Sequence, residues 1–167
     1  MRRRLMWLVL SAIVGAVVYG ATALATPGTG FTGKSLSVGR FGDIDVSNFT
    51  LPANTWQARL NTRGDSDLYV QSNVWNPRGH TGWHTHPGHS LITVTAGTLW
   101  VYDGNDPSCT PKIYKTGQGF LDPGGDHAHV IYNPSPTDQA ETITVQLIPA
   151  GATRRVDIDP APVSCGF

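Results

Sequence analysis

The segment from residue 79 to 89 reads GHTGWHTHPGH and holds four of the six histidines in the chain. His84 and His86 lie two residues apart, so on an extended strand both imidazoles would point to the same face. His127 and His129 form a second pair with the same spacing, shortly after a Pro-Gly-Gly turn. We expect the two pairs to lie on neighbouring strands and to bring three or four imidazoles within reach of one metal ion. Imidazole suits Fe, Mn, Cu, Ni and Zn.

The sequence around these histidines consists of short apolar-alternating runs separated by turn residues. The runs are rich in Val, Ile, Thr, Tyr and Trp, which suit a half-buried pleated sheet, and Gly, Pro, Asn and Asp stand between them. They cover residues 68–75, 90–94, 98–102, 127–132 and 142–148. No segment of helical length shows a 3.6-residue apolar period. The pattern predicts an all-β fold, either a sandwich or a barrel.

Two segments resemble the paired sequence motifs of the cupin superfamily. Residues 79–97 are similar to the first motif, which runs from a glycine through His-x-His to a closing glycine. Residues 117–133 are similar to the second motif, with one additional residue before the histidine. The matching positions are Gly79, His84, His86, Gly97, Gly117, Pro123, Gly125, His129 and Asn133. The resemblance implies a small single-domain cupin, a double-stranded antiparallel β-barrel or jelly roll, which we place at residues 46–160.

The same resemblance implies that His84, His86 and His129 are the metal ligands. The family's glutamate ligand would stand six residues before the closing glycine, where this chain has Ser90. A three-histidine site remains, similar to that of thiol-dioxygenase cupins. His127 is either a fourth ligand or a partner that orients a ligand, and we favour the second role. Asp122 and Asp126 flank the second-motif turn, where turn chemistry alone accounts for aspartates.

Three protein ligands would leave a coordination position open to a small molecule. Such a site fits a metal-dependent enzyme, an oxygenase or an isomerase. It equally fits a non-enzymatic cupin that binds a small ligand without catalysis. A purely structural role is the third alternative, because cupins host many functions. Twelve basic and twelve acidic residues balance, and no basic stripe suggests nucleic-acid binding.

The N-terminus has the three parts of an export signal. Three arginines follow Met1, residues 5–24 are apolar, and Ala-Leu-Ala ends at position 25. We expect residues 1–25 to be a cleaved signal peptide or, alternatively, an uncleaved membrane anchor. The chain is therefore expected to be exported, either secreted or membrane-anchored outside the cytoplasm. We expect residues 26–45 to be a flexible leader.

The two cysteines of the chain fit export. Cys109 and Cys165 are more often disulfide-bonded than free in an exported protein, and two unpaired thiols are the alternative. The bridge would tie the C-terminal tail, residues 161–167, to a loop of the barrel. The resemblance to cupins also makes a homodimer paired through edge strands an open alternative to a monomer.

Overall fold

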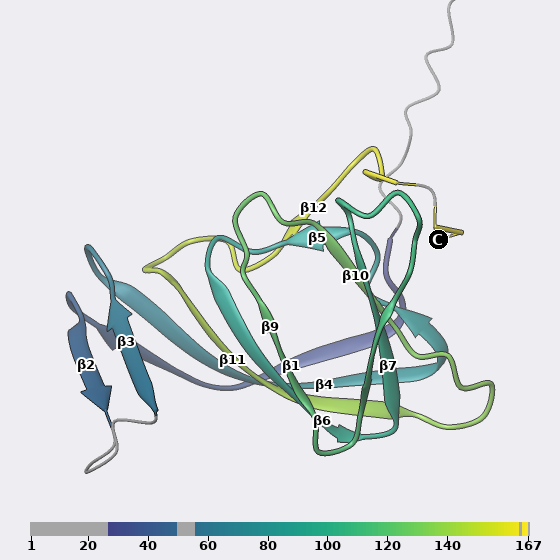
Figure 1. Ribbon diagram of the computed structural model, residues 1–167, viewed down its shortest axis with the longest axis horizontal. Helices are drawn as coiled ribbons and strands as arrows, with labels where there is room; N and C mark the ends of the chain where they lie inside the picture. Colours follow the sequence, from purple (N-terminus) through teal and green to yellow (C-terminus); the bar gives the residue numbers. More distant parts are fainter. Residues whose placement is uncertain (1–26, 50–55, 164, 167) are drawn as a thin grey trace, which may run out of the picture.

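The computed structural model describes residues 27–49, 56–163 and 165–166, and within them the chain forms strands and no helix (Figure 1). The strands are β1 (Thr29–Phe41), β2 (Asp45–Phe49), β3 (Gln57–Asn61), β4 (Ser66–His80), β5 (His84–Thr85), β6 (His89–Ala96), β7 (Thr98–Asp103), β8 (Lys112–Lys115), β9 (Gly119–Asp122), β10 (His129–Tyr132), β11 (Ala140–Pro149) and β12 (Val156–Asp157). A helix long and apolar enough to span a membrane is absent from these ranges. The predicted signal or anchor, residues 1–25, lies outside the described residues.

Ten strands form one antiparallel sheet that curves into a nearly closed barrel (Figure 1). One half of the barrel has the strand order β1-β4-β11-β6-β9, and the other has the order β8-β7-β10-β5-β12. The halves meet where Tyr132 of β10 pairs with His80 at the end of β4. This topology confirms the predicted all-β, jelly-roll-like barrel. The predicted strand at 127–132 is shorter than expected, because β10 begins only at His129.

The long strands of the barrel alternate between buried and exposed residues, as a sheet with one covered face requires. In β11 the inward side chains are Ala140, Thr142, Thr144, Gln146 and Ile148. The ends of this row are apolar and its middle is polar. The barrel interior is therefore not one continuous hydrophobic core, and its polar part has to be satisfied by hydrogen bonds or by a ligand.

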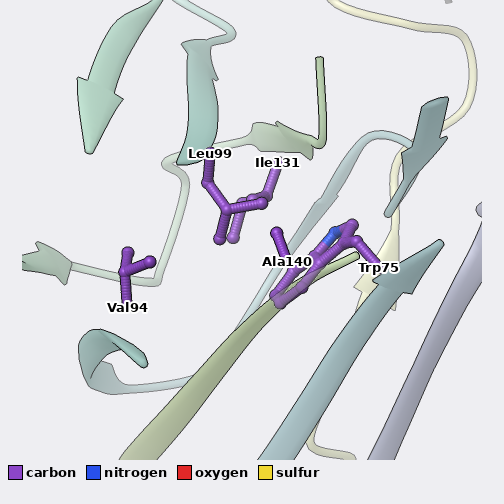
Figure 2. Packing of buried hydrophobic residues seen from close by; sticks show 5 residues of the cluster. All are labelled: Trp75, Val94, Leu99, Ile131 and Ala140. Carbon is purple, nitrogen blue, oxygen red and sulfur yellow. The ribbon is translucent and has the colours of Figure 1, made fainter. Parts of the chain in front are cut away.

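Two hydrophobic clusters pack the fold, the first partly lining the interior cavity and the second packing against the C-terminal segment that contains Ile158 and Cys165. The first cluster comes from five strands, and Figure 2 shows its side chains, with Val94 to one side of the others in this view. They are Trp75, Val94, Leu99, Ile131 and Ala140. The second cluster contains Trp83, Tyr102, Ala128 and Val130. Because their members are almost fully buried, these clusters supply most of the hydrophobic stabilisation of the fold.

The N-terminal leader differs from the prediction. Residues 26–45 were expected to be flexible, but most of them form β1, which pairs with β4 along its whole length. The centre of the Phe31 ring lies 4.9 Å from the centre of the Trp75 ring. Further along, Arg40 donates two hydrogen bonds to Asp67, at 2.8 and 2.9 Å. Backbone pairing and these anchors order a segment whose own apolar pattern is weak.

The barrel boundaries also differ from residues 46–160. β2 and β3 pair only with each other and form a hairpin that stands away from the barrel (Figure 1). The barrel strands begin instead at Thr29, the first residue of β1. At the other end, the tail is joined to the barrel, because a disulfide links Cys165 to Cys109. The predicted bridge is present, and both cysteines pack against the second hydrophobic cluster.

Candidate metal centre

His84 and His86 come from β5 and the turn that follows it. The Nδ1 atom of His84 lies 2.9 Å from the carbonyl oxygen of Gly82, and that of His86 lies 2.6 Å from the carbonyl oxygen of Arg154. A carbonyl can only accept, so both Nδ1 atoms must carry the proton and donate it. In the neutral rings each Nε2 atom therefore has an available lone pair. Backbone carbonyls commonly orient metal-binding histidines in this way.

His129 is brought to the same place by strand pairing. It begins β10 and lies directly opposite His84 in the antiparallel ladder. The centre of its ring is 4.2 Å from that of His84 and 5.6 Å from that of His86. One ligand atom from each of the three side chains lies within 4.8 Å of the other two. The structure thus brings together the three histidines that the sequence singled out, in an arrangement that could hold a metal ion.

All three rings are held in the neutral form that metal binding requires. Burial lowers the pKa of His84 well below its usual value, and the charges of neighbouring groups add to this effect. Burial also lowers the pKa of His86, against the opposing effect of its bond to the Arg154 carbonyl. The pKa of His129 falls to about 4 because the ring is buried, although the nearby Asp122 carboxylate partly opposes the shift. The cluster therefore offers nitrogen lone pairs throughout the neutral pH range.

A carboxylate that the sequence assigned to a turn also faces the cluster. Asp122 is the last residue of β9 and is buried. Its Oδ1 atom accepts a hydrogen bond of 3.0 Å from the Gly124 amide and lies 3.5 Å from Nδ1 of His129. Its Oδ2 atom lies 3.7 Å from Nε2 of His86. Asp122 thus belongs to the site as well as to the turn, and a separate grouping of potential ligands joins it with His127 and His129.

His127 lies at the edge of the cluster. It precedes β10, so it does not share a strand face with His129 as the sequence predicted. Its Nε2 atom lies 3.0 Å from Oδ2 of Asp103, and its ring centre is 6.4 Å from that of His129. His89 stands on the exposed side of β6, where its Nδ1 atom contacts the Pro123 carbonyl. His89 therefore does not join the cluster.

Close packing of two glycine turns holds the cluster together. Gly124 has a φ of +69°, and a β-carbon there would lie 2.3 Å from the carbonyl oxygen of Gly88. A β-carbon on Gly88 would in turn lie 2.2 Å from the carbonyl oxygen of Leu147. Only glycine fits such close backbone approaches. The turn after His86 and the turn after Asp122 are therefore packed backbone to backbone, which places their two side chains side by side.

The cluster opens into a cavity of about 260 Å³ inside the barrel. Its apolar wall includes Trp75 and Ile131, and its polar wall includes Asn73 and Gln146. Asn73 donates hydrogen bonds to the hydroxyl groups of two threonines on β11, at 3.0 and 3.1 Å. This volume admits a small molecule, and the lining offers it both apolar contact and hydrogen-bonding groups.

Two adjacent arginines line the cavity as well. Arg154 is braced from several sides, because it bonds to Gln146 at 3.1 Å and to Ser35 at 2.8 Å, contacts Gln71, and lies 4.4 Å over the ring of Tyr69. Arg155 donates to the carbonyl of Thr81 at 2.6 Å. Fixed guanidinium groups beside a cavity favour ligands with negative charge or with several acceptor atoms.

Comparison with known proteins gives matches in structure only. The sequence matches no family model and no curated protein. A solved cupin-like protein from Thermotoga maritima is 22% identical, with 55% of this chain and 64% of that chain covered and a TM-score of 0.47. For a double-stranded β-helix protein from Klebsiella pneumoniae, the identity is 20%, the coverage is 55% and 75%, and the TM-score is 0.46. For a polyketide cyclase from Streptomyces resistomycificus, the identity is 18%, the coverage is 57% and 64%, and the TM-score is 0.46.

This chain therefore spans just under two thirds of the length of the first and third of these proteins. The similarity to these cupin-like and double-stranded β-helix structures is low in sequence identity. It concerns the fold alone, since one fold serves many functions.

Proposed function

We propose that this chain is an exported cupin that holds a divalent transition-metal ion, one of Fe, Mn, Cu, Ni or Zn, on His84, His86 and His129. The observation that carries the proposal is the pair of contacts to the Gly82 and Arg154 carbonyls. These contacts fix two imidazoles with their Nε2 lone pairs available next to a third buried ring. Metal-binding histidines commonly donate their other ring N–H to a carbonyl in this way.

We further propose that the metal-bearing cavity acts on a small polar molecule, as an oxygenase or an isomerase. The bound ion would supply Lewis acidity or redox chemistry. The protein's own residues would do the rest: the braced guanidinium of Arg154 would orient the ligand, and the apolar side of the cavity around Trp75 would exclude water. Orientation of the ligand next to the reactive centre accounts for much of what such a cavity contributes.

Non-enzymatic binding of a small ligand is the second candidate function. It is favoured by the polar wall, where Asn73 is bonded to two threonines and Gln146 donates to Ser90 at 3.3 Å. Amide and hydroxyl groups that are paired with each other recognise shape and polarity, but they do not exchange protons near neutral pH. The two functions differ in whether the ligand is changed after it binds.

Elemental analysis of the protein, purified without a polyhistidine tag, tests the metal proposal. We expect near-stoichiometric metal in the wild type and almost none in His84→Ala, His86→Ala or His129→Ala. His127→Ala should keep most of its metal if this residue only orients other groups. His89→Ala is the matched control, because its side chain lies outside the cluster. A folded wild-type protein that takes up none of the five ions would refute the proposal.

A turnover assay then separates the two functions. We expect small acidic or hydroxylated molecules to be consumed by the metal-loaded protein, and consumption to stop when a chelator removes the ion. Tight binding of such a molecule with no chemical change, with and without metal, would instead establish the ligand-binding function. The His129→Ala variant is a negative control for metal-dependent turnover, because it is expected to hold almost no metal.

We also propose that residues 1–25 direct export and that the ligand-binding domain is the barrel beginning at β1. The disulfide between Cys109 and Cys165 is consistent with an extracellular protein. A homodimer is supported by the exposed apolar residues on β1 and on the β2-β3 hairpin, among them Leu36, Val38 and Val46. Light scattering of the purified protein at several concentrations tests the dimer, and a constant monomer mass would exclude it.

A further inference from the structure

We propose that Asp122 is the fourth protein ligand of the metal, so that the ion is bound by three imidazole nitrogens and one carboxylate oxygen. This inference rests on the proposed function, because it presupposes that His84, His86 and His129 bind an ion. It adds a carboxylate and its negative charge to a site for which the sequence indicated only histidine ligands. It also specifies that the carboxylate comes from β9.

The first support is the position of Asp122 in the sheet. β9 pairs with β6 so that Asp122 lies directly opposite Ser90, and the two side chains share the inner face. Cross-strand neighbours of this kind have β-carbons only about 5 Å apart. Ser90 is the position at which the sequence led us to look for a carboxylate. The carboxylate is therefore present in the barrel, but on the neighbouring strand.

The second support is a contact between two acceptors. Nδ1 of His86 donates to the Arg154 carbonyl, so the lone pair of its neutral ring is on Nε2, which lies 3.7 Å from Oδ2 of Asp122. No hydrogen-bond donor among the described residues reaches this Oδ2 atom, although Asp122 is only 4% exposed. A buried, unpaired carboxylate oxygen next to a nitrogen lone pair is costly. A cation between them would satisfy both groups.

The third support comes from the opposite oxygen of the same carboxylate. Oδ1 of Asp122 is held by the amide of Gly124 at 3.0 Å and faces Nδ1 of His129 at 3.5 Å. This second approach is a close electrostatic contact and not a hydrogen bond, because Nδ1 of His129 has no hydrogen-bond partner among the described residues. One oxygen thus fixes the carboxylate, and the other is left for the ion. Such a division of roles is typical of a carboxylate ligand whose second oxygen is hydrogen-bonded.

His127 is the competing candidate for the fourth position, because it groups with Asp122 and His129. Its Nε2 atom is engaged by the carboxylate of Asp103, at 3.0 Å, and its buried Nδ1 atom has no hydrogen-bond partner among the described residues. The three-histidine grouping includes neither residue, but Asp122 lies within 3.7 Å of two of those three imidazoles, those of His86 and His129, whereas the ring centre of His127 is 6.4 Å from that of His129. The geometry therefore favours Asp122.

A carboxylate ligand changes what the ion can do. It would lower the net charge of a divalent centre from +2 to +1 and add a hard oxygen to three nitrogens. Carboxylate ligands make a site more suitable for Mn and Fe than imidazoles alone would be. In an octahedral ion, four protein ligands would still leave two positions open to the molecule in the cavity.

Binding of Co²⁺ to chelator-stripped protein tests the inference, with the absorption spectrum of the bound ion as a second readout. We expect Asp122→Asn to raise the dissociation constant by more than about 100-fold and to shift the visible bands, since losing an outer partner alone costs about 10- to 100-fold. Asp126→Asn is the control, because this aspartate is exposed in the same turn. Its affinity and spectrum should match the wild type. Both variants are checked by thermal unfolding without metal.

A rescue experiment distinguishes a ligand from a structural residue. Asp122→Ser should lose Co²⁺ binding, and adding Ser90→Glu should restore it by returning a carboxylate from the adjacent strand. Loss below about 10-fold in Asp122→Asn, with an unchanged Co²⁺ spectrum, would overturn the inference and leave Asp122 an orienting residue. Failure of the proposed function looks different, because the wild type itself would then bind no Co²⁺.

Discussion

Lowering the pH should destabilise the metal-free protein well above the range in which carboxylates titrate. His129 is buried, and its pKa falls from 6.5 to about 4 on folding. A histidine with a depressed pKa in the folded state binds more protons when the chain unfolds. The folded state is therefore fully favoured above about pH 6.5, and its stability falls as the pH drops from there toward about 4.

The pKa difference of His129 sets the expected size of this effect. Each unit of difference corresponds to about 1.4 kcal/mol, so the loss from this one residue amounts to about 3 kcal/mol when the pH reaches 4. His84 and His86 also have lowered pKa values and add to the loss in the same direction. Asp67 does not contribute to the loss of stability in this pH range. Its hydrogen bonds from Arg40 lower its pKa below 3.8, so its contribution is lost only at still lower pH.

Urea unfolding of chelator-treated protein at pH 7.5 and pH 4.5 measures the effect. The wild type should lose about 2 to 3 kcal/mol more than His129→Gln between these two conditions. The glutamine variant keeps a polar side chain of similar size but cannot be protonated. An equal loss in both proteins would show that His129 is not the proton-linked group, and that its imidazole is already charged or already exposed in the folded state.

Three further predictions concern the fold. Asn133→Ala should cost about 3 kcal/mol in urea unfolding, since the two hydrogens of its buried Nδ2 are shared among three backbone carbonyls; a loss below 1 kcal/mol would contradict this. Replacing Cys109 and Cys165 together by serine should cost about 4 kcal/mol, because the bridge joins residues 56 apart, and an unchanged midpoint would count against the loop-entropy reasoning. Leu99→Ala should cost about 2 to 5 kcal/mol by opening a cavity in the first cluster, whereas the exposed Leu91→Ala should cost about 0.5 kcal/mol or less.

The barrel strands could be predicted where their own residues alternate between apolar and polar. β6, β7 and β11 alternate between apolar and polar residues, and the predicted runs at 90–94, 98–102 and 142–148 lie within them. β1 could not be found in this way. It lies at an edge, and its pairing with β4 is specified by the partner strand rather than by apolar residues of its own. Leu36 and Val38 point outward and are exposed, so they give no sign of a core face.

The site could be predicted only in part, because some of its residues are placed by a partner strand and not by their own sequence pattern. His84 and His129 could be predicted as ligands from their residue type and their spacing in the sequence. They lie directly opposite each other in the antiparallel ladder. Asp122 has two functions in the structure, and the sequence reveals only one of them. It precedes Pro-Gly-Gly like any turn aspartate, and it does bond to the Gly124 amide. Its second oxygen can be assigned to the cavity only once the register places Asp122 opposite Ser90.

The energetics of the barrel connect its packing with its function. The residues that stabilise it without a ligand, such as Trp75, Leu99 and Val130, lie in two apolar clusters. The buried polar residues that line the cavity cost stability unless something pairs with them. Asp122 has a buried oxygen atom, Oδ2, that no described group hydrogen-bonds. A bound ion would pair with such groups, so metal binding should stabilise the fold through the same residues that make the metal-free protein sensitive to acid.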